Sequence, residues 1–224
     1  MVDVVIIAKN EGIYVEKIIN SIDKDWHIVY VADRCTDNTI EQLDALRETR
    51  GNLTIIDTTK MDLTGRQTST CRNLGLKYTN AGSDVLFLDG DRYAVGGSYK
   101  DAVDGAKAEI VCFPLQVDSR TPQSFSDTYG CVNSGFFSCG IFFRRWAIDK
   151  VIKWQGTLFN NELQYEWGIE DTSLGDLCYH LGLNAELTDK CVLQGEFTYA
   201  TISKTARLKR FMFREPLNVK WLNN

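Results

Sequence analysis

The feature that most constrains the fold is a regular alternation, in the first half of the chain, of short apolar runs with segments of helical periodicity. The runs are rich in β-branched residues and end at polar or glycine-containing turns, as strands do. They span residues 4–8, 28–32, 53–57, 85–88 and 110–115. This alternation predicts an α/β fold with a mostly parallel central sheet flanked by helices.

Two of the intervening segments carry helix signals. Apolar residues at helical spacing follow Asn10, which we expect to cap the first helix. Thr39 and Gln42 have the spacing of a capping box at the start of the second helix. Both signals place a helix between two strands, as a parallel sheet requires.

Length and composition suit one catalytic domain. The 224 residues, 44% of them hydrophobic and 25% charged, are enough to bury a sizeable core. We expect the domain to span residues 1–200, with two halves at about 1–100 and 101–200, followed by a basic amphipathic segment at 201–224. The first apolar run is too short for a signal sequence and no run reaches membrane-spanning length, so we expect a cytoplasmic protein without a transmembrane segment.

The cysteines and the net charge exclude some classes of function. Seven cysteines without a C-x-x-C pair, in a chain with two histidines, favour reduced and mostly buried thiols over a zinc site. A formal net charge of −5 argues against a protein that coats nucleic acid unaided, although a local basic patch is compatible with it.

Polar segments follow three of the expected strands where those strands end. Residues 9–11 follow the first strand, residues 33–37 the second and residues 89–92 the fourth. Open α/β sheets bind ligands at the carboxyl ends of their strands. We therefore expect the three segments to converge on one crevice.

Asp89-Gly90-Asp91 has the most specific chemistry of these segments. Two carboxylates on a turn after a buried strand offer the oxygen ligands that Mg²⁺ and Mn²⁺ prefer, and Gly90 removes side-chain bulk. Such an ion would also neutralise the charge of a diphosphate leaving group. The alternative is an ordinary Asp-Gly turn between two strands.

Five short motifs occur in a fixed order along the chain. They are Asn10-Glu11, residues 31–39 (VADRCTDNT), Gly65 with residues 71–75 (CRNLG), Asp89-Gly90-Asp91 and residues 167–171 (WGIED). Their order resembles the GT-A fold glycosyltransferases, especially the family-2-like group of inverting enzymes. The resemblance covers residues 4 to about 182 and implies a GT-A (Rossmann-like) fold, with a donor half at about 1–100 and an acceptor half at about 101–200. It also implies non-processive transfer of one sugar, with inversion, from a nucleotide sugar to an acceptor hydroxyl.

The resemblance implies a donor site and a metal site. The implied donor-binding residues are Ala8, Asn10, Glu11, Asp33, Arg72, Asp89 and Gly90. Asp33 would accept a uracil N–H, which favours a UDP-sugar, and Arg72 would steady the diphosphate. Asp91 would bind Mn²⁺ or Mg²⁺, and Asp89 would reach the metal or the ribose. The alternatives are that Asp33 and Asp37 cap the next helix and that Arg72 is a solvated helix residue.

The resemblance also assigns the catalytic and acceptor residues. Asp171 would be the base that takes the proton of the acceptor hydroxyl, and Glu170 would orient the acceptor. The alternative, which can hold at the same time, is a helix N-terminus that favours acids through its dipole. The implied acceptor-binding residues are Phe136, Phe137, Trp167 and Gly168. An ordinary core role is the alternative for these aromatic residues.

Two family features are missing from the chain. Neither His27 nor His180 follows the Glu-Asp helix, where many relatives have a metal-binding histidine, so the metal would rely on Asp91, phosphates and water, or metal dependence would be weak. The Gln-x-x-Arg-Trp motif of processive synthases is also missing, since residues 141–143 precede Arg144-Arg145-Trp146. Single-sugar addition is therefore favoured.

The acceptor is the least constrained part of the prediction. We expect a glycan or a lipid-linked glycan. Basic and apolar residues interleave over 204–220, which suits contact with an anionic membrane or a polyanion, or a closing helix packed on the domain. One alternative is a phage-type DNA glycosyltransferase that acts on hydroxymethylated or already glycosylated bases.

Two rival functions lie outside the glycosyltransferases. A sugar nucleotidyltransferase needs a glycine-rich basic loop after the first strand, and residues 9–12 (KNEG) do not form one. A non-catalytic nucleotide-sugar-binding protein is the other alternative, and the presence of both Asp91 and Asp171 speaks against it.

Overall fold

The computed structural model describes residues 1–65, 67–117, 140–163 and 169–195. Its larger sheet consists of β1 (Val2–Ala8), β2 (His27–Ala32), β3 (Leu53–Asp57), β4 (Asp84–Asp89), β6 (Ile110–Cys112), β8 (Gly140–Phe143) and β9 (Ala185–Leu187). A smaller sheet consists of β5 (Tyr93–Gly97), β7 (Leu115–Val117) and β10 (Cys191–Gly195). The helices are α1 (Gly12–Ser21), α2 (Thr39–Arg50), α3 (Thr68–Leu76), α4 (Tyr99–Asp104), α7 (Arg145–Gln155), α8 (Ile169–His180) and the 3₁₀ turn η1 (Asn161–Leu163).

The larger sheet is mostly parallel, as predicted. Its strand order is β3-β2-β1-β4-β8-β6-β9, and the smaller sheet has the order β5-β10-β7. β1 pairs in parallel with β2 and β4, and β2 pairs in parallel with β3. Only β8 runs against its neighbours, β4 and β6. The predicted α/β fold class is therefore confirmed.

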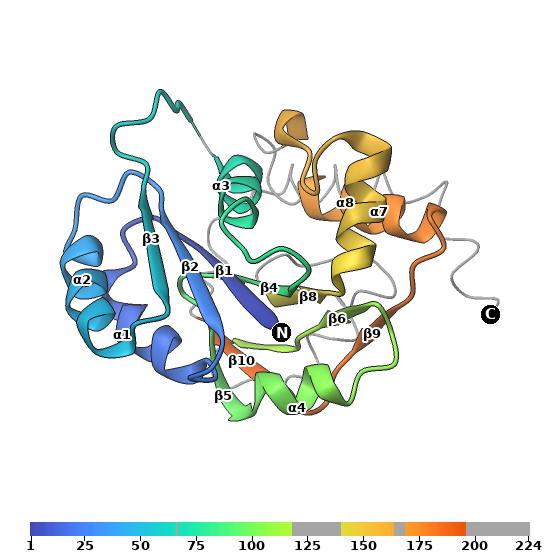
Figure 1. The fold of residues 1–224 in the computed structure, drawn as a ribbon, viewed down its shortest axis with the longest axis horizontal. Coiled ribbons are helices and arrows are strands. Elements are labelled where there is room, and N and C mark those ends of the chain that lie inside the picture. Colours follow the sequence, from blue (N-terminus) through green and yellow to red (C-terminus); the bar gives the residue numbers. More distant parts are fainter. Residues whose placement is uncertain (66, 118–139, 164–168, 196–224) are drawn as a thin grey trace.

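Helices cover both faces of the larger sheet. Val4 and Ile6 of β1 belong to a core that also includes residues of α1, α2 and α4, whereas Val5 and Ile7 face a core with residues of α3, α7 and α8. Figure 1 shows α1 and α2 together on one side of the sheet and α3, α7 and α8 together on another. Because β1 is buried on both faces, its sequence is almost continuously apolar.

Helix α3 approaches β1 and β2 closely. A Cβ atom at Gly75 would lie 2.4 Å from Cγ1 of Val5 and 3.1 Å from Cγ2 of Val31. A side chain at this position would therefore push α3 away from the sheet. Since α3 also carries Arg72, this close approach helps to set the position of a predicted site residue.

The caps predicted for Asn10 and for Thr39 with Gln42 are wrong, whereas the alternative that Asp37 binds the start of the second helix is confirmed. Asn10 has φ 58°, and its Oδ1 accepts a hydrogen bond from the Thr36 N–H at 2.7 Å and makes no cap for α1. Asp37 binds the starts of two helices, because its carboxylate accepts from the N–H groups of Gly12 and Thr39 at 3.0 and 3.1 Å. Thr39 is thus the first residue of α2 and makes no capping box with Gln42. The Asp37 carboxylate, local to α2 and distant in sequence from α1, thus takes the place of both predicted caps.

The predicted strand at residues 110–115 is two strands in different sheets. β6 ends at Cys112 and β7 begins at Leu115. Pro114 lies between them and has no N–H to continue a ladder. Its carbonyl accepts from Leu193 of β10 instead, which leads the chain into the smaller sheet.

Two further expectations, on the state of the cysteines and on membrane-spanning segments, can be compared with the described part of the chain. Its five cysteines are free, and four of them are buried, which agrees with reduced, packed thiols. No helix in the described ranges has the length and apolar character to cross a bilayer.

Candidate active site

The loops that carry three predicted site segments meet at one edge of the larger sheet. β1 ends at Ala8, and its residue Ile7 pairs with Asp89, the last residue of β4. The N–H of Asp33, directly after β2, donates to the Ala8 carbonyl at 2.7 Å. The N–H of Gly90 donates to the Ile7 carbonyl at 2.8 Å. The structure thus brings these segments together at the carboxyl ends of adjacent strands.

Gly90 lies where a side chain has no room. A Cβ atom there would be 2.3 Å from Oε2 of Glu11 and 3.1 Å from the hydroxyl of Tyr30. The Asp-Gly-Asp segment is a turn, because the N–H of Arg92 donates to the Asp89 carbonyl at 3.0 Å. It leads from β4 in one sheet to β5 in the other, so it is not a hairpin turn. The glycine allows the Glu11 carboxylate to lie against this turn.

Burial and neighbouring carboxylates raise the pKa values of two acidic side chains at this turn, Glu11 and Asp91. Burial, followed by the charges of Asp91 and Asp89, raises the pKa of Glu11 to about 9. Burial, opposed by Arg92 and reinforced by Asp89, raises the pKa of Asp91 to about 6. Both shifts mean that the charged forms are unfavourable here. A bound cation would relieve this unfavourable negative charge.

Two buried arginines pair with the two aspartates of the turn. Nη2 of Arg72 lies 2.7 Å from Oδ1 of Asp89, and Nη1 of Arg92 pairs with Oδ2 of Asp91. The Arg72 side chain is only 4% exposed, so its interpretation as a solvated helix residue is wrong. Its Nε and Nη1 atoms are buried without a hydrogen-bond partner among the described residues. Such a guanidinium can bind an anion such as a phosphate.

Arg72 also lies near the predicted catalytic pair. Burial lowers the pKa of Arg72, but the carboxylates of Asp89, Asp171 and Glu170 together raise it above its ordinary value. Glu170 and Asp171 are buried in the first turn of α8, the helix start that the sequence indicated. The hydroxyl of Thr68 in α3 lies 3.3 Å from Oε1 of Glu170. One cation therefore connects two predicted motifs that are far apart in the sequence.

Helix α3 is fixed to the segment that precedes α8. Oδ1 of Asn73 accepts from the Phe159 N–H at 3.0 Å, and its Nδ2 donates to the Phe159 carbonyl at 2.7 Å. The same Nδ2 lies 2.9 Å from Oδ1 of Asn161. The Arg72 guanidinium is 5.4 Å from the centre of the Phe159 ring. These contacts hold Arg72 between the β4 turn and α8.

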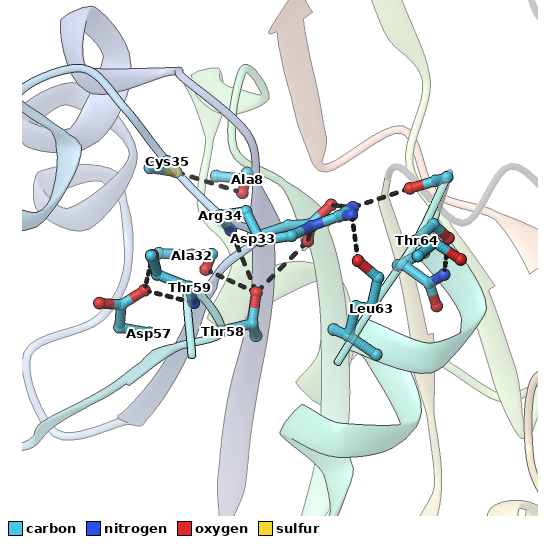
Figure 2. A network of polar contacts seen from close by, with 12 residues as sticks. Ala8, Ala32, Asp33, Arg34, Cys35, Asp57, Thr58, Thr59, Leu63 and Thr64 are labelled. Atoms are coloured by element: carbon cyan, nitrogen blue, oxygen red, sulfur yellow. Dashed lines mark hydrogen bonds and ion pairs between the residues drawn. The ribbon is translucent and has the colours of Figure 1, made fainter. Parts of the chain in front are cut away.

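The carboxylate of Asp33 is held by its neighbour Arg34. Nε of Arg34 lies 2.6 Å from Oδ1, and Nη2 lies 2.8 Å from Oδ2. The hydroxyl of Thr58 is 3.3 Å from Oδ1. Figure 2 shows how the same guanidinium reaches the loop after β3, where it donates to the carbonyls of Leu63 and Gly65 at 2.8 and 2.7 Å. These partners occupy Asp33, which does not cap α2.

Arg34 and Tyr30 are two residues of this site to which the sequence patterns assign no role. Arg34 has φ 49°, a left-handed conformation that side chains disfavour and that no sequence pattern indicates here. Tyr30 is fully buried in β2, and its hydroxyl has no hydrogen-bond partner in the described ranges. The available signal was a tyrosine in a run of smaller apolar residues, because a buried tyrosine hydroxyl usually needs a polar neighbour.

Several predicted residues lie outside the described ranges. These are the acceptor-binding residues Phe136, Phe137, Trp167 and Gly168, and the basic segment 204–220. Their roles therefore stay predictions from the sequence.

Asp89 and Asp91 are the predicted metal ligands. In the described residues, no group of three or more histidine, cysteine, aspartate or glutamate side chains is arranged to hold a metal ion. Two carboxylates suffice where phosphate and water supply the other oxygen ligands. Burial, together with neighbouring carboxylates, raises the pKa values of Asp91 and Glu11, and a divalent cation beside these groups would stabilise their charged forms. The residues present therefore fit such an ion.

Comparison with sequence families gives a match over more than half of the chain. The profile of "Glycosyl transferase family 2" matches residues 3–145. A comparison with curated proteins finds no match.

Solved structures share the fold at low sequence identity. The mannosyltransferase PcManGT from Pyrobaculum calidifontis, in complex with GDP-Man and Mn²⁺, has a TM-score of 0.66 and 16% identity. GalNAc-T7 with UDP, GalNAc and Mn²⁺ has a TM-score of 0.64 and 12% identity. Glucosyl-3-phosphoglycerate synthase from Mycobacterium tuberculosis, with Mn²⁺, UDP-glucose and phosphoglyceric acid, has a TM-score of 0.62 and 14% identity.

The lengths of these proteins differ from that of the present chain. The matches cover 96%, 89% and 96% of this chain, in the same order. They cover 61% of the mannosyltransferase, 44% of GalNAc-T7 and 79% of the synthase. At these identities the likeness establishes the GT-A fold, but it does not assign the activities of the three proteins to this chain.

Proposed function

The chain belongs to glycosyl transferase family 2, and on this premise we propose that it transfers one sugar from a nucleotide sugar to an acceptor hydroxyl. The donor is a UDP-sugar, the cofactor is Mn²⁺ or Mg²⁺, and each event adds a single sugar with inversion. One observation carries the proposal. Buried Arg72 pairs with Asp89 of the β4 turn, and it lies close enough to Glu170 and Asp171 for their charges to raise its pKa. Arg72, which would bind the leaving diphosphate, and Asp171, the candidate base, thus belong to one site.

The donor side uses the residues at the ends of β1, β2 and β4. Asp33 accepts an N–H of the base, Ala8, Asn10 and Glu11 line the same edge, and Gly90 keeps the turn close. The unused N–H groups of Arg72 bind the diphosphate. The structural relatives were solved with Mn²⁺ and GDP-Man or UDP-glucose, which supports a nucleotide sugar with a divalent cation.

Asp171 is the proposed base, with Glu170 orienting the acceptor. Its carboxylate takes the proton of the acceptor hydroxyl while the hydroxyl oxygen bonds to the anomeric carbon. The bond from that carbon to the diphosphate breaks, and the diphosphate leaves with the electron pair. Arg72 donates hydrogen bonds to this developing charge. A divalent cation at Asp91 and Asp89, when bound, supplies further neutralisation.

The acceptor we propose is a glycan or a lipid-linked glycan. Phe136, Phe137, Trp167 and Gly168 are the proposed acceptor residues, and residues 204–220 are the proposed contact with an anionic membrane or polyanion. A DNA acceptor stays the alternative that the sequence leaves open, and a cytoplasmic location stays a prediction from the sequence.

The donor site is tested by calorimetric titration of UDP, with GDP, CDP and TDP as controls, in Mn²⁺ and then in EDTA. We expect micromolar binding of UDP that is lost in EDTA and weakened at least tenfold in Asp91→Asn. Absence of binding by every nucleotide would refute the donor site.

The base is tested separately by Asp171→Asn. This variant should bind UDP like the unchanged protein, but its kcat in a screen of UDP-sugars and acceptors should fall by about 10²–10⁴-fold. Asp149→Asn is the matched control, because that carboxylate lies on α7 and is 61% exposed. Full transfer by Asp171→Asn would remove Asp171 from its catalytic role.

A further inference from the structure

Arg34 occupies a backbone position that suits glycine better. Its φ of 49° lies in the left-handed region, where a side chain carries a steric cost that glycine avoids. Its N–H is held by the Thr58 hydroxyl at 3.1 Å and the Ala32 carbonyl at 3.0 Å. Its guanidinium makes four further hydrogen bonds. An arginine kept in such a conformation points to a role for the guanidinium.

The contacts of Asp33 leave at least one acceptor position open. A carboxylate has about four such positions, two on each oxygen. On Oδ1, Nε of Arg34 uses one position, and the Thr58 hydroxyl shares its single proton between this oxygen and the Ala32 carbonyl, each 3.3 Å away. On Oδ2, Nη2 of Arg34 uses one position, and no other described group donates to it. The Asp33 side chain is 12% exposed, so an incoming ligand can still reach part of it.

Nucleobases differ in the number of N–H groups that they offer to a carboxylate. Uracil offers one, at N3. Guanine offers two adjacent groups, at N1 and at the exocyclic amine, and this pair matches both oxygens of a free carboxylate. A carboxylate already engaged by the fork of an arginine can accept the single group but not the pair. Guanine would then keep a donor without a partner, which lowers its affinity.

We propose that Arg34 sets the nucleotide preference of this site, favouring uridine over guanosine, by occupying the paired acceptor face of Asp33. The inference rests on the proposed function, because it takes Asp33 as the residue that contacts the base. Arg34 is a specificity-determining residue that acts through Asp33. Its bonds to the carbonyls of Leu63 and Gly65 keep the guanidinium in place when a base binds (Figure 2).

The test is calorimetric titration of UDP and GDP, in Mn²⁺, with the full chain and two variants. Arg34→Gly suits the observed φ and frees both oxygens of Asp33. Arg34→Lys keeps the positive charge but cannot form the two-pronged contact. We expect the ratio of UDP affinity to GDP affinity to fall about tenfold or more in Arg34→Gly, through tighter GDP binding. Arg34→Lys should give an intermediate ratio.

A purely structural role for Arg34 gives a different result. If it only fixes the loop, both affinities fall by the same factor and the ratio stays constant, which would overturn the proposal. If Arg34→Gly does not fold, an unchanged ratio in Arg34→Lys overturns it equally. Failure of the proposed function is distinguishable, because the unchanged protein would then bind neither nucleotide.

Discussion

Arg72→Met and Asp89→Asn remove opposite members of one ion pair, and we expect them to change stability very differently. Asp89→Asn leaves a guanidinium that is 4% exposed without its nearest counter-charge. Arg72→Met leaves a carboxylate that is 30% exposed and that water can still reach. Both variants should lose most transfer activity, because both disturb the proposed diphosphate contact.

The magnitude follows from the geometry of the pair. Two unit charges about 4 Å apart attract by about 4 kcal/mol at an effective dielectric constant of about 20. Partial exposure of Asp89 and the nearby carboxylates of Glu170 and Asp171 reduce the net loss, so Asp89→Asn should lower the free energy of unfolding by about 2 kcal/mol. Arg72→Met loses the same attraction and takes a cation away from the buried Glu170 and Asp171, but it also removes a buried guanidinium with two unpartnered nitrogens, which offsets these losses. Its free energy of unfolding should stay within about 1 kcal/mol of the original value.

Urea and thermal unfolding without metal or nucleotide measure this difference. About 2 kcal/mol corresponds to a loss of about 4–8 °C in Tm for a protein of this size. Arg47→Met is the matched control, because Arg47 lies on α2 and is 53% exposed in its pair with Asp44. If Arg72→Met were as destabilised as Asp89→Asn, Arg72 would be a structural anchor, and the argument from an uncompensated buried charge would fail.

Two further predictions concern the Glu11 carboxylate. Gly90→Ala places a Cβ 2.3 Å from Oε2 of Glu11, so urea unfolding should show a loss of about 1–3 kcal/mol in the free energy of unfolding. The control Gly96→Ala places its Cβ where nothing lies within 4 Å, so it should change the free energy of unfolding by less than about 0.5 kcal/mol. Equal losses in the two variants would contradict the steric argument. The folded state raises the pKa of Glu11 from 4.5 to about 9 and so binds more protons than the unfolded state in that window, which means that stability in EDTA should fall as pH rises through it. Glu11→Gln should flatten this fall in Tm between pH 5 and pH 9, and an unchanged slope would place its cause elsewhere.

The sequence predicted the strands best where burial alone determines them. Residues 2–8 are apolar at almost every position because β1 packs between two layers of helices, and the predicted strand differs from the observed one only at its start. The start of α8 was also predictable, since Glu170 and Asp171 precede apolar residues at helical spacing. Local patterns suffice to predict a strand or helix when burial acts on it at regular intervals along the sequence.

Contacts between loops far apart in the sequence were not predictable from local patterns. Asn10 is a good capping residue, yet Asp37 supplies the bond at the start of α1, because β1 and β2 end side by side. At the start of α2 the same carboxylate lies only two residues before Thr39, and the sequence did offer Asp37 as a cap there. The conformation of Arg34 depends on carbonyls in the loop after β3. Pro114 marked the break after β6, but the smaller sheet it leads to forms only when β10 returns from the end of the described chain.

The charge balance of the site gives a physical reason to expect metal and nucleotide to bind together. Among the described residues, Arg72 and Arg92 pair with Asp89 and Asp91, and the raised pKa of Glu11 leaves this third acid largely protonated at neutral pH. Such a nearly neutral site attracts a free divalent cation weakly, and it gives a diphosphate only the unused N–H groups of Arg72. A cation and a diphosphate that bind together largely neutralise each other's charge, so neither must bind alone to a nearly neutral site. Loss of UDP binding in EDTA is therefore expected even though Asp89 and Asp91 already have arginine partners.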